Sequence, residues 1–127
     1  MCGIIGINSN KQVTASIINS LKKLEYRGYD SAGLATLSNG LINEVKTEGR
    51  VDKLEKSLLL QNIEGSIGIG HVRWATHGVP NSLNAHPHSS NNVSVVHNGI
   101  IENSTLLKKF LTSKGHKFKS QTDTEVI

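Results

Sequence analysis

The spacing of hydrophobic and polar positions predicts strands and helices that follow one another through short links. Residues 3–8 are mostly apolar and short enough for a strand. A second set of apolar residues recurs at helical spacing: Val13, Ile17, Ile18, Leu21 and Leu24. We therefore expect a helix there, ending before the turn-like sequence at 26–30.

The middle of the chain predicts a β-hairpin, a helix and a strand. The hairpin strands are expected over 33–38 and 41–47, because Asn39-Gly40 between them is the strongest short hairpin signal. A further helical stripe follows: Val51, Leu54, Leu58 and Leu59. The strand runs from Ser66 to about Arg73 and contains two glycines, Gly68 and Gly70, which permit close backbone approach.

The pattern then weakens. Residues 74–92 are expected to form a long loop, and loops of that length are more often functional than inert. A strand over 93–97 should lead into Asn98-Gly99. A helix capped by Asn103 and stopped by Gly115 is predicted next, with its apolar face on Leu106, Leu107, Phe110 and Leu111.

The last six residues predict the start of another helix. Thr122 and Glu125 have the spacing of a capping box, and Val126 and Ile127 would begin an apolar face. A helix of one turn is not stable by itself. We therefore expect these 127 residues to be part of a longer chain, and in any case one domain or part of one.

Composition and charge narrow the setting. A hydrophobic content of 36% is enough for a core, and no apolar run approaches the roughly 20 residues that span a bilayer. The absence of a basic-then-apolar leader favours a cytoplasmic protein. The net charge of +4 comes mainly from lysines without interleaved aromatic residues, which does not favour a nucleic-acid surface.

The only cysteine is Cys2, and it is followed by Gly3. Removal of Met1 would place a thiol and a free amine on one residue. An ordinary α-amine titrates near about 7.7–8.0 and can therefore take a proton from a thiol near neutral pH. Cys2 is thus a candidate nucleophile that carries its own base. The alternative is a buried structural cysteine, and position alone leaves both open.

Four further positions match what cleavage of an amide requires. Asn98 and Gly99 offer a side-chain amide and a neighbouring backbone N–H for an oxyanion, although an ordinary Asn-Gly turn is the alternative. Arg73 and Asp123 suit the α-carboxylate and α-ammonium of a free amino acid. The alternatives are a surface arginine and an aspartate at a helix start.

The six histidines prompt a metal hypothesis. His86-Pro87-His88 could supply ligands together with His71, His77 and His97. No Cys-x-x-Cys or His-Glu-x-x-His pattern accompanies them, so we predict no metal and no cofactor. Histidines in a long loop beside a strand end are better explained as hydrogen-bonding groups for a polar substrate.

Several segments together carry a family resemblance. They are Cys2-Gly3-Ile4-Ile5-Gly6 and the residues at 25–33, 73–78, 84–88, 96–103 and 122–127. In this order they resemble class II glutamine amidotransferases of the N-terminal nucleophile hydrolase type, over essentially the whole chain. The asparagine-forming relatives usually carry Arg-Gly-Pro-Asp where this chain has Arg-Gly-Tyr-Asp at 27–30. The resemblance therefore points to the branch that makes glucosamine 6-phosphate.

The resemblance implies a fold and a set of site residues. The fold would be α+β, a partial αββα four-layer sandwich. Cys2 would hydrolyse the side-chain amide of L-glutamine through a glutamyl thioester, giving glutamate and ammonia, with the oxyanion held by Asn98 and Gly99. The implied glutamine-binding residues are Arg73, Trp74, Thr76, His77, His86 and Asp123.

The resemblance also implies partners that lie outside this chain. Residues 1–127 would be the N-terminal part of the amidotransferase domain, without the sugar-phosphate isomerase domain that aminates fructose 6-phosphate. The longer protein would be a homodimer, with no nucleic acid or membrane partner. Two other functions stay open: a glutamine-binding fragment without activity, and another amide hydrolase with an N-terminal cysteine.

Overall fold

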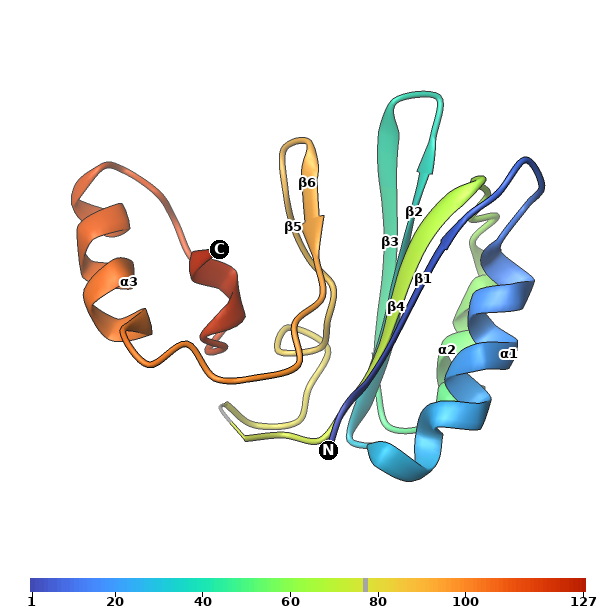
Figure 1. The fold of residues 1–127 in the computed structure, drawn as a ribbon, viewed down its shortest axis with the longest axis horizontal. Helices are drawn as coiled ribbons and strands as arrows, with labels where there is room; N and C mark the ends of the chain where they lie inside the picture. The colour runs from blue at the N-terminus through green and yellow to red at the C-terminus, as the bar shows by residue number, and fades with distance from the viewer. Residues whose placement is uncertain (77) are drawn as a thin grey trace.

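The computed structural model describes residues 1–76 and 78–127, and its elements form four successive layers. Helices α1 and α2 make the first layer, a four-stranded sheet the second, the β5–β6 hairpin the third, and α3 the fourth (Figure 1). This arrangement confirms the predicted αββα order. The elements are β1 (Gly3–Asn8), α1 (Thr14–Leu24), the 3₁₀ turn η1 (Glu25–Arg27), β2 (Ser31–Ser38), β3 (Leu41–Glu48), α2 (Val51–Leu60), β4 (Ile67–Arg73), β5 (His88–Ser90), β6 (Val93–Val95), α3 (Ser104–Ser113) and the 3₁₀ turn η2 (Thr124–Val126).

The larger sheet has the strand order β1-β4-β2-β3, and all of its neighbours are antiparallel. The predicted hairpin between β2 and β3 is confirmed. Its turn residues Asn39 and Gly40 have φ angles of 51° and 75°, which is the geometry of a type I′ turn. At the other edge Gly3 pairs with Val72, so the start of β1 lies beside the end of β4.

The hydrophobic core lies between this sheet and helices α1 and α2. Alternation along β4 turns Gly68, Gly70 and Val72 toward the helices. A Cβ added to Gly70 would lie 2.6 Å from a methyl group of Ile17, so the glycine lets α1 approach the sheet closely, as predicted. The fully or nearly buried core residues are Val13, Ile17, Ile18, Leu21, Ala32, Leu34, Val45, Val51, Leu54 and Val72.

The opposite face of the sheet is polar and carries the third layer. The same alternation turns His71 and Arg73 away from the helices, and both side chains are buried. The ring of His86 stacks on His71, with centroids 4.3 Å apart and planes 16° apart. Gly33 pairs with His71, and a Cβ added there would overlap the carbonyl oxygen of His86. The third layer therefore packs directly on the backbone of the sheet.

Two sequence expectations for this region need correction. The loop predicted over 74–92 ends earlier, because residues 88–90 form β5 and pair with β6. The polar sequence His-Ser-Ser hides this strand, which is fixed by tertiary contacts: the Ser89 hydroxyl donates to Glu44 on β3. The strand predicted over 93–97 ends at Val95.

The predicted capping box at 122–125 does not form. Asp123 stands at the N-terminal end of η2 and makes no side-chain capping hydrogen bond. The carboxylate of Glu125 instead accepts hydrogen bonds from the backbone N–H groups of Lys119 and Ser120, with N–O distances of 2.7 Å. These residues precede the turn, so the carboxylate closes the loop before η2 rather than starting a helix.

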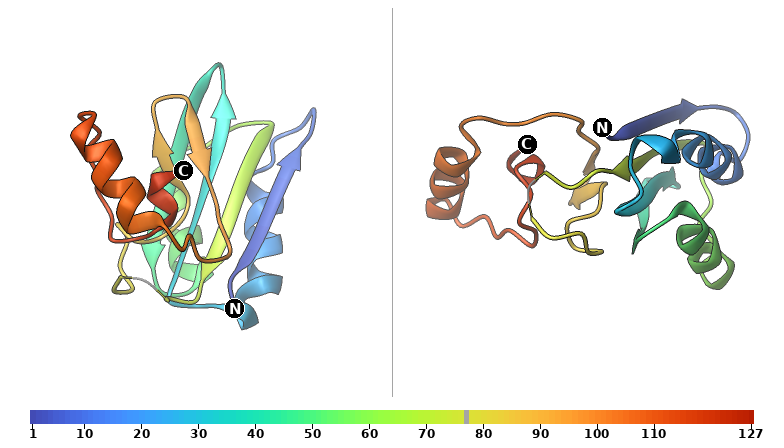
Figure 2. Two further views of the ribbon diagram at one scale, coloured as in Figure 1. Left: turned by 60° about the vertical axis from the view of Figure 1, so that its left-hand side comes forward. Right: turned by 90° about the horizontal axis from the view of Figure 1, so that it is seen from below.

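Helix α3 forms over the predicted residues but has no core of its own. Gly115 ends it with φ 92°, as expected, whereas the Asn103 side chain makes no capping bond. None of its residues is buried, and Leu106 and Phe110 are 69% and 59% exposed. Figure 2 shows α3 at the side of the molecule away from α1 and α2. Within residues 1–76 and 78–127, no helix has the length and apolar character needed to cross a membrane.

Candidate active site

Cys2 lies at the edge of the sheet, next to the C-terminal end of β4. The pairing of Gly3 with Val72 sets it beside Trp74, whose backbone N–H donates to the Cys2 Sγ at 3.2 Å. The sulfur also lies 3.5 Å from the Trp74 carbonyl oxygen. A thiol at a strand end, held by backbone groups and partly exposed, can be reached by a small molecule.

A cavity of about 240 Å³ opens beside this thiol. Eight of the nine site residues expected from the sequence line it: Cys2, Arg73, Trp74, Thr76, His86, Asn98, Gly99 and Asp123. The ninth, His77, lies outside the described residues. The other residues that line the cavity are Met1, His97, Ile100, Thr122 and Thr124. The tertiary structure thus brings together positions that are distant in the sequence.

Opposite charges face this cavity from Arg73 and Asp123. Both residues are buried, with exposures of 4% and 9%. Burial lowers the pKa of the Arg73 guanidinium, while Cys2, Asp30 and Asp123 oppose that shift. One carboxylate oxygen of Asp123 accepts the Ile101 backbone N–H at 2.7 Å, which orients the group. Such a pair can bind a zwitterionic ligand such as a free amino acid.

Asn98 and Gly99 lie beside the nucleophile. The Asn98 Nδ2 donates to the Cys2 carbonyl oxygen at 3.1 Å. A side-chain amide has two N–H donors, so a second one is available for a neighbouring oxygen. A Cβ on Gly99 would lie 2.9 Å from the His97 Nε2, and glycine therefore suits this crowded backbone. The contact places an amide donor beside the residue that carries the thiol.

Two histidines, His86 and His97, line the cavity, and the rings of His71 and His88 pack against His86. Burial lowers the pKa of His86 to about 2 and that of His71 to about 4, aided by neighbouring cationic groups, so both rings are neutral at pH 7. The His88 Nε2 and the His97 Nδ1 lie 2.9 and 3.1 Å from the hydroxyls of Thr122 and Thr124. The described residues contain no cluster of three metal-ligating side chains. The rings of His88 and His97 contact the two threonine hydroxyls, and those of His71 and His86 stack on each other.

Sequence reasoning missed part of this wall. The sequence pattern predicts a helix cap at Thr122 and no role for Thr124, yet both line the cavity on either side of Asp123. The sequence offers a weak signal for the two threonines, because they flank the predicted site residue Asp123. The glycine-punctuated segment around Arg27 favours a guanidinium that binds a carboxylate or phosphate. In the structure its Nε instead donates to the Cys2 carbonyl oxygen at 3.0 Å.

The family of the chain follows from comparison with known proteins. Residues 59–127 match a family model described as a glutamine amidotransferase domain. That match covers more than half of the chain, which therefore belongs to the glutamine amidotransferase domain family. The resemblance drawn from the sequence motifs is confirmed.

Two curated relatives show which members of this family the chain is similar to. Glutamine--fructose-6-phosphate aminotransferase (isomerizing) of Clostridium acetobutylicum is 58% identical over 129 residues, covering 100% of this chain and 21% of the relative. The enzyme of the same name from Mesorhizobium japonicum is 55% identical over 127 residues, with the same coverage. The chain thus spans about a fifth of the length of these curated relatives.

Solved structures support the fold. Glutamine phosphoribosylpyrophosphate amidotransferase from B. subtilis, complexed with ADP and GMP, superposes with a TM-score of 0.83 at 29% identity. The superposition covers 99% of this chain and 28% of the B. subtilis chain. A structure described as the allosteric regulatory enzyme of purine biosynthesis gives 0.82 at 30% identity, with the same coverage. The expected α+β fold of the N-terminal nucleophile hydrolase type is confirmed.

Proposed function

We propose that this chain is the glutamine-hydrolysing part of a longer amidotransferase, and that residues 1–127 form the N-terminal part of that domain. One observation carries the proposal: Cys2, Arg73, Asn98 and Asp123 line a single cavity despite their separation in sequence. The names of the relatives support a further step, in which the ammonia is transferred to fructose 6-phosphate by a sugar-phosphate isomerase domain.

The reaction needs the α-amine of Cys2. Met1 is 78% exposed and precedes a small residue, so a processing enzyme can reach it. Its removal converts the Cys2 amide nitrogen into an amine within the same residue as the thiol. The amine takes the thiol proton, and one residue then supplies both base and nucleophile.

The chemistry proceeds through a thioester. The Cys2 sulfur attacks the side-chain carbonyl carbon of glutamine. The resulting oxyanion accepts hydrogen bonds from the side-chain N–H of Asn98 and the backbone N–H of Gly99. The ammonium of Cys2 returns its proton to the amide nitrogen, the carbon–nitrogen bond breaks, and ammonia leaves. Water then adds to the thioester with the amine as base. The carbon–sulfur bond breaks, which releases glutamate and restores the thiol.

The remaining site residues hold the substrate. Arg73 binds the α-carboxylate and Asp123 the α-ammonium, since each presents the opposite charge to the cavity. Trp74 and Thr76 are exposed and line the cavity, so they help to shape the pocket. The family resemblance gives the same role to His77, which lies outside the described residues. His86 is 5% exposed and forms the inner wall.

Location and assembly belong to the same proposal. A reactive thiol must stay reduced, which favours the cytoplasm. A homodimer of the longer protein stays a prediction that rests on the family resemblance alone. Glutamine and the isomerase domain of the longer chain are the proposed partners.

The test is the intact mass of the full chain before and after treatment with a diazoketone analogue of glutamine, followed by peptide mapping. We expect loss of Met1 and one adduct on Cys2 that excess glutamine prevents. Because the sequence has a single cysteine, the site of a thiol adduct is unambiguous. Release of glutamate from glutamine is measured in parallel.

Each alternative predicts a different result. A glutamine-binding fragment without activity would bind glutamine but give neither adduct nor glutamate. In a hydrolase that acts on other amides, asparagine or simple acyl amides would prevent the labelling of Cys2 as well as glutamine does. Cys2→Ala is the control that removes the nucleophile, and retention of glutamate release in this variant would refute the proposed function.

A further inference from the structure

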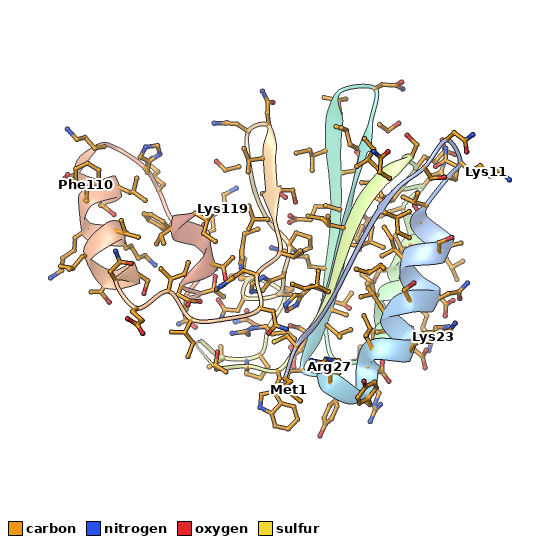
Figure 3. The ribbon with its side chains drawn as sticks, in the orientation of Figure 1. Met1, Lys11, Lys23, Arg27, Phe110 and Lys119 are labelled. Atoms are coloured by element: carbon orange, nitrogen blue, oxygen red, sulfur yellow. The ribbon has the colours of Figure 1, made fainter. Side chains whose placement is uncertain are left out.

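We propose that Arg27 is a positioning residue that holds the Cys2 nucleophile in its reactive orientation, an inference that rests on the proposed function. Its Nε donates to the Cys2 carbonyl oxygen at 3.0 Å. The Asn98 Nδ2 donates to the same oxygen at 3.1 Å. The carbonyl is therefore held by the turn after α1 and by the segment after β6. Figure 3 shows Arg27 close to the chain start at Met1.

Cys2 needs such a contact because the strand ladder does not include it, and the Trp74 N–H contacts its sulfur rather than its backbone. The pairing of β1 with β4 begins at Gly3, so Cys2 lies one residue beyond the ladder. Once Met1 is removed, Cys2 becomes the chain terminus, and terminal residues are poorly ordered unless they are tied down. Rotation about the Cys2 backbone moves the thiol relative to Asn98 and Gly99. A fixed carbonyl limits that rotation.

The backbone around Arg27 brings it to this place independently of its side chain. A Cβ on Gly28 would lie 2.6 Å from the Arg73 carbonyl carbon, so the η1 corner packs tightly on the end of β4. A Cβ on Gly3 would lie 2.9 Å from the Leu24 Cβ, so the same corner also packs on β1. Shortening Arg27 leaves both backbone contacts in place, and we expect its variants to fold.

Two substitutions separate the hydrogen bond from the charge. Arg27→Met and Arg27→Gln both remove the positive charge and have similar stems. Only glutamine carries an N–H donor at the position of the arginine Nε. We expect Arg27→Met to lower kcat for glutamine hydrolysis at least about tenfold, and Arg27→Gln to retain most of it.

The kinetic signature distinguishes positioning from substrate binding. Arg27 does not line the cavity, whereas Arg73 and Asp123 do. The KM for glutamine should therefore change less than about threefold while kcat falls. Alkylation of Cys2 by iodoacetamide, which needs no oxyanion donors, should stay near the parental rate, and labelling by the glutamine-analogue diazoketone should slow with kcat.

Arg50→Met is the matched control. Arg50 pairs with Glu25 in the same turn at 2.7 Å and stacks over Tyr29, without touching Cys2. This variant loses an arginine beside η1, and we expect its kcat to stay within about twofold of the parent. Thermal melting of all variants reports whether they fold.

The outcomes separate the two proposals. An inactive and unlabelled parent would refute the proposed function itself. With an active parent, a folded Arg27→Met variant that keeps the parental kcat, or that changes only KM, would refute the role of Arg27. If Arg27→Met does not fold, Arg27→Gln decides: a loss of kcat beyond tenfold in the folded Arg27→Gln protein overturns the role of the Nε hydrogen bond.

Discussion

Helices α1 and α3 have the same kind of apolar stripe, but they have different surroundings. In α1 the stripe is buried against the sheet, and Ile17 and Leu21 are fully inaccessible to solvent. In α3 none of the residues is buried, and within the described residues no element covers Leu106 or Phe110. An amphipathic pattern thus predicts a helix and its apolar face, but it does not say what packs on that face.

The largest expected effect tests this difference directly. Leu21→Ala should lower the free energy of unfolding by about 2–5 kcal/mol, because the deletion leaves a cavity in the core. Leu106→Ala is the matched control on α3, where the side chain is 69% exposed, and should cost less than about 0.5 kcal/mol. Urea unfolding followed by circular dichroism measures both. Equal losses would show that the two helices contribute alike.

A second prediction concerns the contact between the sheet and the third layer. Gly33→Ala should destabilise the protein by about 1–3 kcal/mol, because the added methyl group meets the His86 carbonyl. Gly6→Ala in β1 is the matched control, since the nearest atom to its added Cβ is 4.0 Å away. Chemical denaturation compares the two variants. A neutral Gly33→Ala would mean that the layers are not in close contact.

A third prediction concerns acid stability. Burial lowers the pKa of His71 to about 4, so the unfolded state takes up a proton first as the pH falls below about 6.5. Stability is therefore full above that pH and declines toward pH 4, with His71 alone contributing a loss of roughly 2 kcal/mol by pH 5. Urea midpoints measured from pH 7 to 5 report this slope.

His71→Leu sharpens the same measurement. Among the described residues neither ring nitrogen of His71 has a partner in hydrogen-bond geometry, and the nearby His97 backbone is the group that raises its pKa. An apolar side chain of similar size should therefore be tolerated. The variant should lose stability less steeply below pH 6.5 than the parent. His116→Leu, at an exposed position after α3, is the control and should keep the parental slope. An unchanged slope in His71→Leu would exclude His71 as a source of the acid sensitivity.

Local patterns were sufficient for most of the secondary structure. The helical stripes, the Asn39-Gly40 turn and the Gly115 stop act within a few residues of themselves, so the sequence predicts them without tertiary information. Strand β5 was missed because its residues are polar and its pairing depends on β6 and on Glu44. The capping-box pattern failed because Glu125 is engaged by the loop before it.

The sequence alone determined which residues can carry the chemistry: a single cysteine at position 2, an Asn-Gly pair, an arginine and an aspartate. Only the tertiary structure decided that they meet in one cavity, because antiparallel pairing of β1 with β4 brings Cys2 to Arg73 and packing of the third layer adds Asn98 and Asp123. It alone revealed Arg27 at the Cys2 carbonyl. Such contacts join residues far apart in the chain, and local sequence patterns do not encode them.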